Sequence, residues 1–123
     1  MSGNKLLLDT NVVLSILGSE KVFSSLEGKE LFISFITELE LFSYPVLTKE
    51  EEKSIAFFLS KVTILDINRH IKLKTIHLRK KYKLKLPDAI ICATAASKNL
   101  TLVSNDKQFK KITALPIVTL NQL

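Results

Sequence analysis

Short apolar runs alternate along this chain with stretches in which apolar residues recur at helical spacing. The runs are rich in leucine, isoleucine and valine, which is typical of strands buried on both faces. They predict strands at residues 5–9, 31–34, 62–65, 100–103 and 117–119. The stretches between them predict helices at about 12–17, 21–26, 37–42, 48–59, 68–82, 88–98 and 106–112.

Polar residues at the starts of these stretches give the helices their expected ends. Thr37 and Asn68 are expected to cap the helices that follow them, and Thr48 with Glu51 forms a capping box. Pro87 suits a first helical turn, and Asn99 can end the same helix. The helix at 88–98 is apolar nearly all round, so we expect it to be buried.

Strands that alternate with helices favour right-handed crossovers and a parallel sheet. We therefore expect an α/β fold, a single three-layer domain over residues 1–123. Its mostly parallel central sheet of about five strands would be flanked by helices. The chain of 123 residues is long enough for one continuous core, and its 46% apolar content is ordinary for a globular protein.

Cysteine content and the start of the chain bear on where the protein works. A single cysteine, Cys92, excludes an internal disulfide and favours a reducing compartment, and we expect Cys92 to be a small core residue. Residues 1–5 are polar and do not resemble a signal peptide, and no apolar run approaches the length of a bilayer span. The expected location is cytoplasmic, with no membrane association.

The net charge of +6 is concentrated in one segment. Residues 67–87 carry no acid, while the rest of the chain has a net charge of about −2. The segment holds eight cations: Arg69, Lys72, Lys74, Arg79, Lys80, Lys81, Lys83 and Lys85. Such a region attracts polyanions, although a run of charge alone is more often a solvated helix face.

Four acids follow predicted strands or open predicted helices. They are Asp9 after the first strand, Glu40 in the helix after the second, Asp88 at the start of the apolar helix and Asp106 after the fourth strand. Each alone could be a cap, a turn residue or a solvated helix residue. Together they would meet at one edge of a parallel sheet.

Acids that meet in one pocket repel each other. Two carboxylates about 5 Å apart repel by roughly 3 kcal/mol at an effective dielectric constant near 20. Such a cluster raises its pKa values or binds a cation. Oxygen ligands favour Mg²⁺ or Mn²⁺ over zinc, and either ion can activate a water for attack on a phosphodiester.

Four segments of the chain resemble the motifs of PIN-domain ribonucleases, in the family's order. They are Leu6-Leu7-Leu8-Asp9-Thr10-Asn11, the segment 33–41 around Glu40, Leu86-Pro87-Asp88-Ala89 within 86–95, and the segment 102–109 around Asp106. In the second motif Glu40, and not Glu38, matches the family's acid. The subgroup that the chain resembles most is the VapC-like toxins of toxin–antitoxin pairs.

This resemblance implies an endoribonuclease that depends on Mg²⁺ or Mn²⁺, forms a homodimer, and is inhibited by a cognate antitoxin whose C-terminal segment covers the acidic pocket. Asp9, Glu40, Asp88 and Asp106 would be catalytic, and Asp9, Asp88 and Asp106 would hold the metal directly or through water. Asn11 and Ser104 would support the site. Asn105 stands where many relatives carry a basic residue, which puts a role for this position in phosphate binding in doubt.

RNA would be gripped by the basic segment. The residues that we expect to contact it are Arg69, Lys72, Arg79, Lys80 and Lys83, with Lys107, Lys110 and Lys111 as further candidates.

Two alternatives to a nuclease remain open from the sequence. A PIN-like domain that binds RNA or protein without turnover would share the fold. A phosphoacceptor receiver domain would use Asp66 after the third strand, but the chain lacks the paired acids at the first strand that this chemistry requires.

Overall fold

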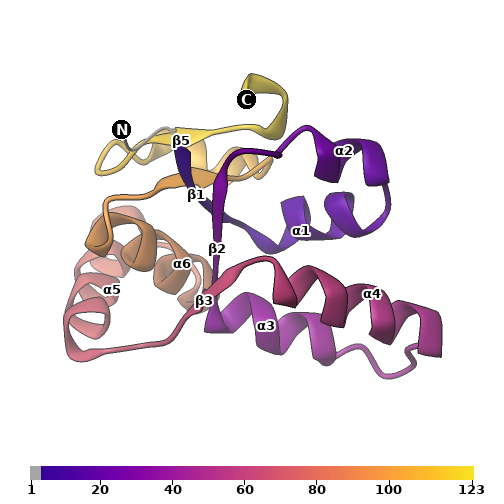
Figure 1. The fold of residues 1–123 in the computed structure, drawn as a ribbon. Coiled ribbons are helices and arrows are strands. Elements are labelled where there is room, and N and C mark those ends of the chain that lie inside the picture. Colours follow the sequence, from indigo (N-terminus) through magenta and orange to yellow (C-terminus); the bar gives the residue numbers. More distant parts are fainter. Residues whose placement is uncertain (1–3) are drawn as a thin grey trace.

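The middle layer of the protein is a five-stranded parallel sheet with strand order β3-β2-β1-β4-β5 (Figure 1). It is seen in a computed structural model that describes residues 4–123. The strands are β1 (Lys5–Leu8), β2 (Glu30–Ser34), β3 (Thr63–Leu65), β4 (Thr101–Val103) and β5 (Ile117–Val118). The predicted α/β fold is confirmed, and the sheet is parallel throughout.

Helices cover both faces of this sheet. They are α1 (Thr10–Leu17), α2 (Glu20–Ser24), α3 (Phe35–Phe42), α4 (Lys49–Ser60), α5 (Arg69–Tyr82) and α6 (Leu86–Ser97), with the short 3-10 helices η2 (Lys107–Lys111) and η3 (Leu120–Gln122). Figure 1 shows α5 and α6 side by side at one end of the molecule, with α3 and α4 towards the other. The three-layer arrangement predicted from the sequence is therefore present.

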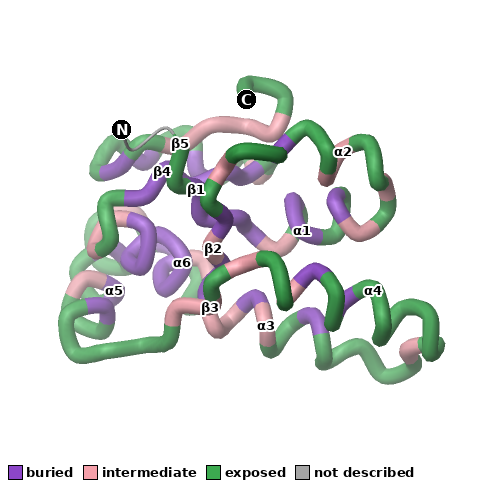
Figure 2. The backbone as a smooth tube through the Cα atoms, in the orientation of Figure 1, coloured by how far each residue is buried: buried purple, intermediate pink, exposed green. Residues whose placement is uncertain are grey.

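β1 lies in the centre of the sheet and is buried on both faces. Leu6 and Leu8 point into one core with α1, α2 and α4, whereas Leu7 points into the other core with α5 and α6. This alternation follows from the period of two along a strand. Figure 2 shows the buried residues concentrated in β1, β4 and α6. The strand is thus fixed from both sides, and so is the residue that follows it.

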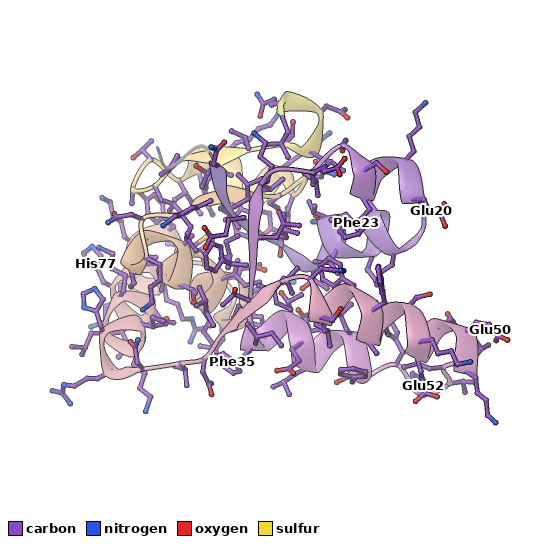
Figure 3. The ribbon with its side chains drawn as sticks, in the orientation of Figure 1. Glu20, Phe23, Phe35, Glu50, Glu52 and His77 are labelled. Carbon is purple, nitrogen blue, oxygen red and sulfur yellow. The ribbon has the colours of Figure 1, made fainter. Side chains whose placement is uncertain are left out.

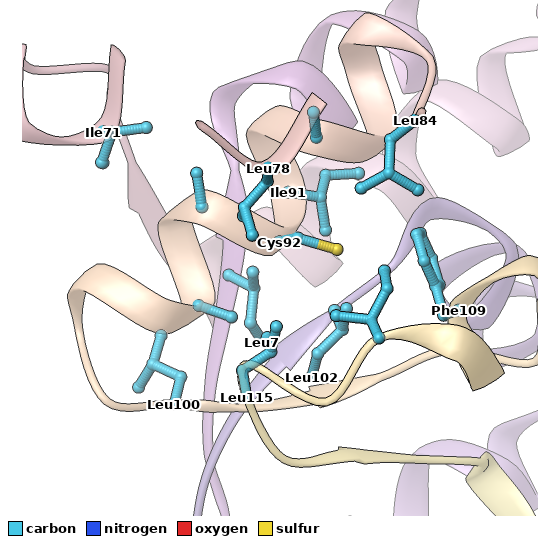
Figure 4. Close-up of a cluster of buried hydrophobic side chains, with 14 residues drawn as sticks. Leu7, Ile71, Leu78, Leu84, Ile91, Cys92, Leu100, Leu102, Phe109 and Leu115 are labelled. Atoms are coloured by element: carbon cyan, nitrogen blue, oxygen red, sulfur yellow. The ribbon is translucent and has the colours of Figure 1, made fainter. Parts of the chain in front are cut away.

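The apolar helix α6 is the most deeply buried helix of the fold. Seven successive residues from Ala89 to Ala95 are buried, as the apolar sequence predicts. Figure 4 shows Ile91 and Cys92 packed among Leu7, Leu78 and Leu102. The small side chains of α6 let α5 pack closely against it.

α5 and α6 form a hairpin with a three-residue connection. α5 ends at Tyr82, and Lys83 adopts the left-handed conformation with φ of 56° that commonly ends a helix. Ile71 and Leu78 of α5 face the core, whereas His77 projects from the outer face (Figure 3).

Most of the predicted helix ends are confirmed. Thr48 and Glu51 form both hydrogen bonds of a capping box, at 3.0 and 2.9 Å. Asn68 caps α5, with its Oδ1 accepting from the amide of Ile71 at 2.8 Å. Asn99 adopts the left-handed conformation just beyond α6.

The prediction that Thr37 caps its helix is wrong. Ser34, the last residue of β2, caps α3 and accepts from the amide of Ile36 at 3.1 Å. The helix therefore starts directly at the strand end, and Thr37 lies in its first turn, fully buried. α1 and α6 likewise begin two residues earlier than predicted, at Thr10 and Leu86, and α2 is shifted to residues 20–24.

Within residues 4–123, no helix combines the length and apolar character needed to cross a membrane. The prediction made for the polar start of the chain falls partly on residues 1–3, which lie outside the described residues.

Candidate acidic active site

Asp9 connects the central strand to the first helix. It follows β1 directly and occupies the N-cap position of α1, where its Oδ1 accepts from the amide of Thr10 at 2.8 Å. Its other oxygen, Oδ2, accepts from Ser104 Oγ at 2.7 Å and from Asn11 Nδ2 at 3.4 Å. Asp9 is only 6% exposed. It therefore acts as a cap and is also fixed in a largely buried polar network.

The surroundings of Asp9 make its charged form costly. Burial raises the pKa of its carboxyl above the ordinary value, and this exceeds the opposing effect of the hydrogen bonds from Ser104 and Thr10. The charges of Asp106 and Glu40 raise the pKa further. The charges of two of the other predicted acids therefore act on Asp9.

Asp88 completes this set of acids from the first turn of α6. Its pKa is raised by burial, next by the charges of Asp9 and Asp106, and to a smaller extent by Glu40. The nearby cation of Lys85 acts in the opposite direction. The structure thus brings all four predicted acids into one electrostatic neighbourhood at the carboxyl edge of the sheet.

Glu40 is connected to the site by hydrogen bonds that involve two threonines, which the sequence analysis did not identify. Thr10 Oγ1 donates to Glu40 Oε1 at 2.6 Å, and it lies 3.0 Å from Thr37 Oγ1. Thr37 precedes Glu40 by three residues and so shares its helix face. That spacing, together with a hydroxyl directly after Asp9, is the signal in the sequence that could have identified the pair.

Ser104 links two of the acids at the end of β4. While its Oγ donates to Asp9, it also accepts from the amide of Asp106 at 3.1 Å. Asp106 caps η2 and accepts from the amide of Gln108 at 2.9 Å. Asp106 is therefore held by hydrogen bonds at its backbone amide and at its side chain. Ser104, predicted to support the site, contacts Asp9 directly.

Asn11 and Asn105 extend the network to the end of the chain. Asn11 Oδ1 accepts from the amide of Asn105 at 3.4 Å, and Asn105 Oδ1 accepts from the amide of Leu120 at 3.1 Å. Asn105 thus connects the C-terminal segment to the residue beside Asp9. Asn105, which stands where many relatives carry a basic residue, therefore has a structural role in this chain.

Cys92 lies beneath the acids in the core. Burial, and then the charges of Asp9 and Asp88, raise the pKa of its thiol to about 12. The thiol is consequently protonated at neutral pH, which disfavours a role as a nucleophile. This agrees with the prediction of a small core residue.

The donor set suits a hard divalent cation bound largely through water. Among residues 4–123, no group of three or more acidic, histidine or cysteine side chains is drawn together tightly enough to ligate one ion. Mg²⁺ normally binds proteins through only one or two carboxylates and keeps several of its waters. Asp9, Asp88 and Asp106 fit that mode, and their assignment as metal ligands stays a prediction.

The cations predicted to bind RNA lie along α5 and just beyond it. Arg69, Lys72, Arg79, Lys80 and Lys83 are all exposed. The helix spans 14 residues, about 21 Å at 1.5 Å per residue, so Arg69 and Lys83 lie far apart. The cations at its C-terminal end are separated from α6, which carries Asp88, by a three-residue connection.

Arg79 differs from the other four because its side chain is already engaged. Its Nε donates to the carbonyl of Leu84 at 3.2 Å and braces the connection between α5 and α6.

Comparison with solved structures finds the same fold in toxin–antitoxin proteins. A toxin–antitoxin complex from Klebsiella pneumoniae contains a chain that is 32% identical, with a TM-score of 0.78 over 94% of this chain and 97% of that one. VapBC-1 from nontypeable Haemophilus influenzae gives 24% identity and a TM-score of 0.79 over 95% and 98% of the two chains. VapBC2 from Rickettsia felis, solved bound to a promoter DNA fragment, gives 22% identity and a TM-score of 0.82 over 94% and 98%.

The family comparison is equally broad in its coverage. The family model of the PIN domain matches residues 6–115, which include all four acids and the whole of the sheet edge that carries them. A comparison with curated proteins found no significant match. On the extent of the family match, the chain belongs to the PIN-domain family.

Proposed function

We propose that this protein is an endoribonuclease that depends on Mg²⁺ or Mn²⁺ and serves as the toxin of a toxin–antitoxin pair. The observation that carries the proposal is the group of four acids whose charges act on one another at the carboxyl edge of the sheet, here called the acidic pocket. Asp9, Glu40, Asp88 and Asp106 come from four separate elements, and the charges of the other three act on Asp88. Such a pocket is costly for the fold, which supports a role in cation-dependent chemistry.

The acids divide into two roles in this proposal. Asp9, Asp88 and Asp106 would hold the divalent ion, which supplies an activated water and neutralises charge that develops on the phosphate. Glu40 orients the attacking water. Ser104 and Asn11 keep the Asp9 carboxylate in one orientation through the bonds described above.

Binding of the RNA backbone would fall to the exposed cations. Phosphate contacts supply most of the affinity for nucleic acid and little sequence information. Arg69, Lys72, Lys80 and Lys83 provide such contacts in this proposal, with a smaller part for Arg79 because its Nε is engaged. Pocket acids repel phosphates, so cations outside the pocket are needed to hold the substrate.

A protein partner forms the second part of the proposal. The 32% identical chain was solved in a toxin–antitoxin complex, which supports a cognate antitoxin for this chain. Exposed apolar side chains of Leu39, Phe42, Tyr44 and Val46, on and after α3, also support a protein contact close to Glu40. We further propose that the toxin is a homodimer that acts in the cytoplasm, and that residues 1–123 work as one domain.

The test of the enzymatic part is metal-dependent cleavage. Purified protein is incubated with a fluorescently labelled single-stranded RNA and Mn²⁺ or Mg²⁺, with EDTA added to a parallel sample. We expect cleavage that EDTA stops. RNA binding without cleavage at any concentration of either ion would instead identify a binding domain.

The partner and the dimer are tested separately. Co-expression with its cognate antitoxin should give a stable complex that no longer cuts RNA. Light scattering of the isolated protein should give twice the monomer mass of 13.9 kDa.

A further inference from the structure

Two threonine hydroxyls connect the first turns of α1 and α3 to Glu40. Thr10 is the first residue of α1 and Thr37 is the third residue of α3. The two helices follow neighbouring parallel strands, so both threonines lie at the same edge of the sheet. Their oxygens are 3.0 Å apart, and the Glu40 carboxylate lies 2.6 Å from Thr10 Oγ1.

The direction of these hydrogen bonds follows from the number of protons available. A hydroxyl has one proton to donate, and Thr10 donates its proton to Glu40. The contact between the threonines can therefore form only if Thr37 donates to Thr10. The resulting chain runs from the fully buried Thr37 through Thr10 to the exposed Glu40. Each bond in such a chain polarises the next.

Thr10 holds two acids of the pocket at once. Its amide donates to Asp9 Oδ1 at 2.8 Å, and its hydroxyl donates to Glu40 Oε1 at 2.6 Å. One residue thus sets the spacing between the two carboxylates. This spacing depends on the side-chain rotamer of Thr10. The hydroxyl of Thr37 lies where it can favour the rotamer that directs the Thr10 hydroxyl to Glu40.

Glu40 needs this constraint more than Asp9 does. Asp9 is buried and accepts three hydrogen bonds, whereas Glu40 is exposed on a helix surface. A free glutamate side chain loses conformational entropy when it is fixed in one orientation, so an exposed glutamate needs a partner to hold it there. The bond to Thr10 has the short length typical of a hydroxyl that donates to a carboxylate.

We propose that Thr37 is a positioning residue for the acidic site, because its buried hydroxyl fixes Thr10, which in turn directs the Glu40 carboxylate. This inference rests on the proposed nuclease function. Thr37 does not contact substrate in this account. Its effect is transmitted through one intermediate residue.

The test uses variants that keep the shape of the side chain and remove its hydroxyl. Thr37→Val loses the donor, and Thr37→Ser retains it. Thr94→Val is the matched control, because the Thr94 hydroxyl is also buried but donates to the carbonyl of Ile90 within its own helix α6 and not to Thr10 or Glu40. Glu40→Ala, which removes the acceptor of the Thr10 hydroxyl, and the double variant Thr37→Val/Glu40→Ala complete a cycle.

We expect Thr37→Val to lower kcat by about 10- to 100-fold. This is the range found when a residue that orients a functional side chain by a hydrogen bond is removed. KM should change by no more than about twofold, since the residue does not act through substrate binding. Thr37→Ser should restore kcat, and Thr94→Val should retain it. In the Glu40→Ala background, where Thr10 has lost its acceptor, Thr37→Val should have no further effect on kcat.

The second readout is thermal unfolding in the absence of metal. If the hydrogen-bonded chain exists, the loss of Tm in the double variant should be smaller than the sum of the losses in the two single variants. Additive losses of Tm would overturn the inference, because they would mean that Thr37 and Glu40 are not connected.

The two readouts separate this inference from the proposed function. If the wild-type protein does not cut RNA, the proposed function fails and the Tm cycle alone decides the inference. If the wild-type protein cuts RNA and Thr37→Val keeps its kcat, the inference is overturned and the nuclease assignment stands.

Discussion

Ser104 Oγ donates a 2.7 Å hydrogen bond to Asp9 Oδ2, although the two residues are 95 positions apart in the sequence. The contact joins the carboxyl ends of the neighbouring strands β1 and β4. Ser104 is 3% exposed, so water cannot readily replace it as the donor. Because the same Oγ accepts from the amide of Asp106, one hydroxyl aligns two acids of the pocket.

Ser104→Ala should shift the pH dependence of cleavage toward higher pH. The hydrogen bond from Ser104 favours the ionised form of Asp9 and lowers its pKa, so its loss leaves the pKa raised further. The acidic limb of a plot of kcat/KM against pH reports this change. Ser97→Ala is the control, since the buried Oγ of Ser97 has no hydrogen-bond partner within residues 4–123. An unchanged acidic limb in Ser104→Ala would contradict the role given to this bond.

Asp9→Asn should make the protein more stable at neutral pH. The folded protein raises the pKa of Asp9, so it binds more protons than the unfolded chain at pH values between the two pKa values. The free energy of unfolding therefore falls as pH rises from the unfolded pKa, near 3.8, through the folded pKa. Each unit of pKa shift corresponds to about 1.4 kcal/mol.

Asparagine removes the charge at this position and caps a helix as well as aspartate does. Thermal unfolding at pH 7 should show a higher Tm in Asp9→Asn than in the wild-type protein. The difference should vanish below pH 3. A variant that is less stable than the wild type at pH 7 would contradict the sign of the shift.

A divalent cation should stabilise the folded protein. Binding to the folded state alone adds about 2.7 kcal/mol at a ligand concentration 100 times Kd. We expect Mn²⁺ to raise the Tm of the wild-type protein and EDTA to reverse the change. Asp9→Asn should show a much smaller increase. Equal increases in both proteins would place the cation elsewhere.

Charges at the C-terminal end of the basic helix should matter more for RNA binding than those at its start. Lys80 and Lys83 are close in sequence to the turn that leads into α6, whereas Arg69 and Lys72 lie at the opposite end of α5. Lys80→Gln/Lys83→Gln and Arg69→Gln/Lys72→Gln remove equal charge. Both pairs are best made in the Asp9→Asn background, which prevents cleavage during the measurement.

The readout is the dependence of RNA affinity on salt concentration. Removal of one cation that binds a phosphate should reduce the slope of log K against log salt by about 0.7 for a single strand. The Lys80/Lys83 pair should reduce the slope by more than the Arg69/Lys72 pair. Equal reductions would mean that the whole helix face contacts RNA.

Features set by neighbouring residues could be predicted from the sequence. The capping box of Thr48 and Glu51 depends on contacts within one helical turn, and so does the cap at Asn68. The placement of Asp9 could be predicted as well, because an apolar run followed by an acid puts that acid at the end of a strand. The alternation of strands and helices then limits the fold to a parallel sheet.

Features set by distant contacts could not be predicted in this way. Thr37 looks like a cap in the sequence, but Ser34 caps the helix because α3 begins directly at the end of β2. The bonds that join Thr10 to Glu40 and Asn105 to Leu120 depend on how separate elements pack. Arg79 looks equivalent to the other cations in the sequence, and only the fold brings its side chain to the carbonyl of Leu84.

The central claim is that the pocket around Asp9 cuts RNA with a divalent cation, and the single-turnover cleavage rate of Asp9→Asn tests it most directly. Asp66→Asn is the control, because Asp66 is exposed after β3 and accepts from the amide of its neighbour Ile67 at 2.8 Å. With saturating Mn²⁺, we predict that Asp9→Asn loses at least about 100-fold in rate, since an ion that stabilises the transition state contributes several kcal/mol. Asp66→Asn should keep the wild-type rate. Wild-type cleavage by a folded Asp9→Asn protein would contradict the account.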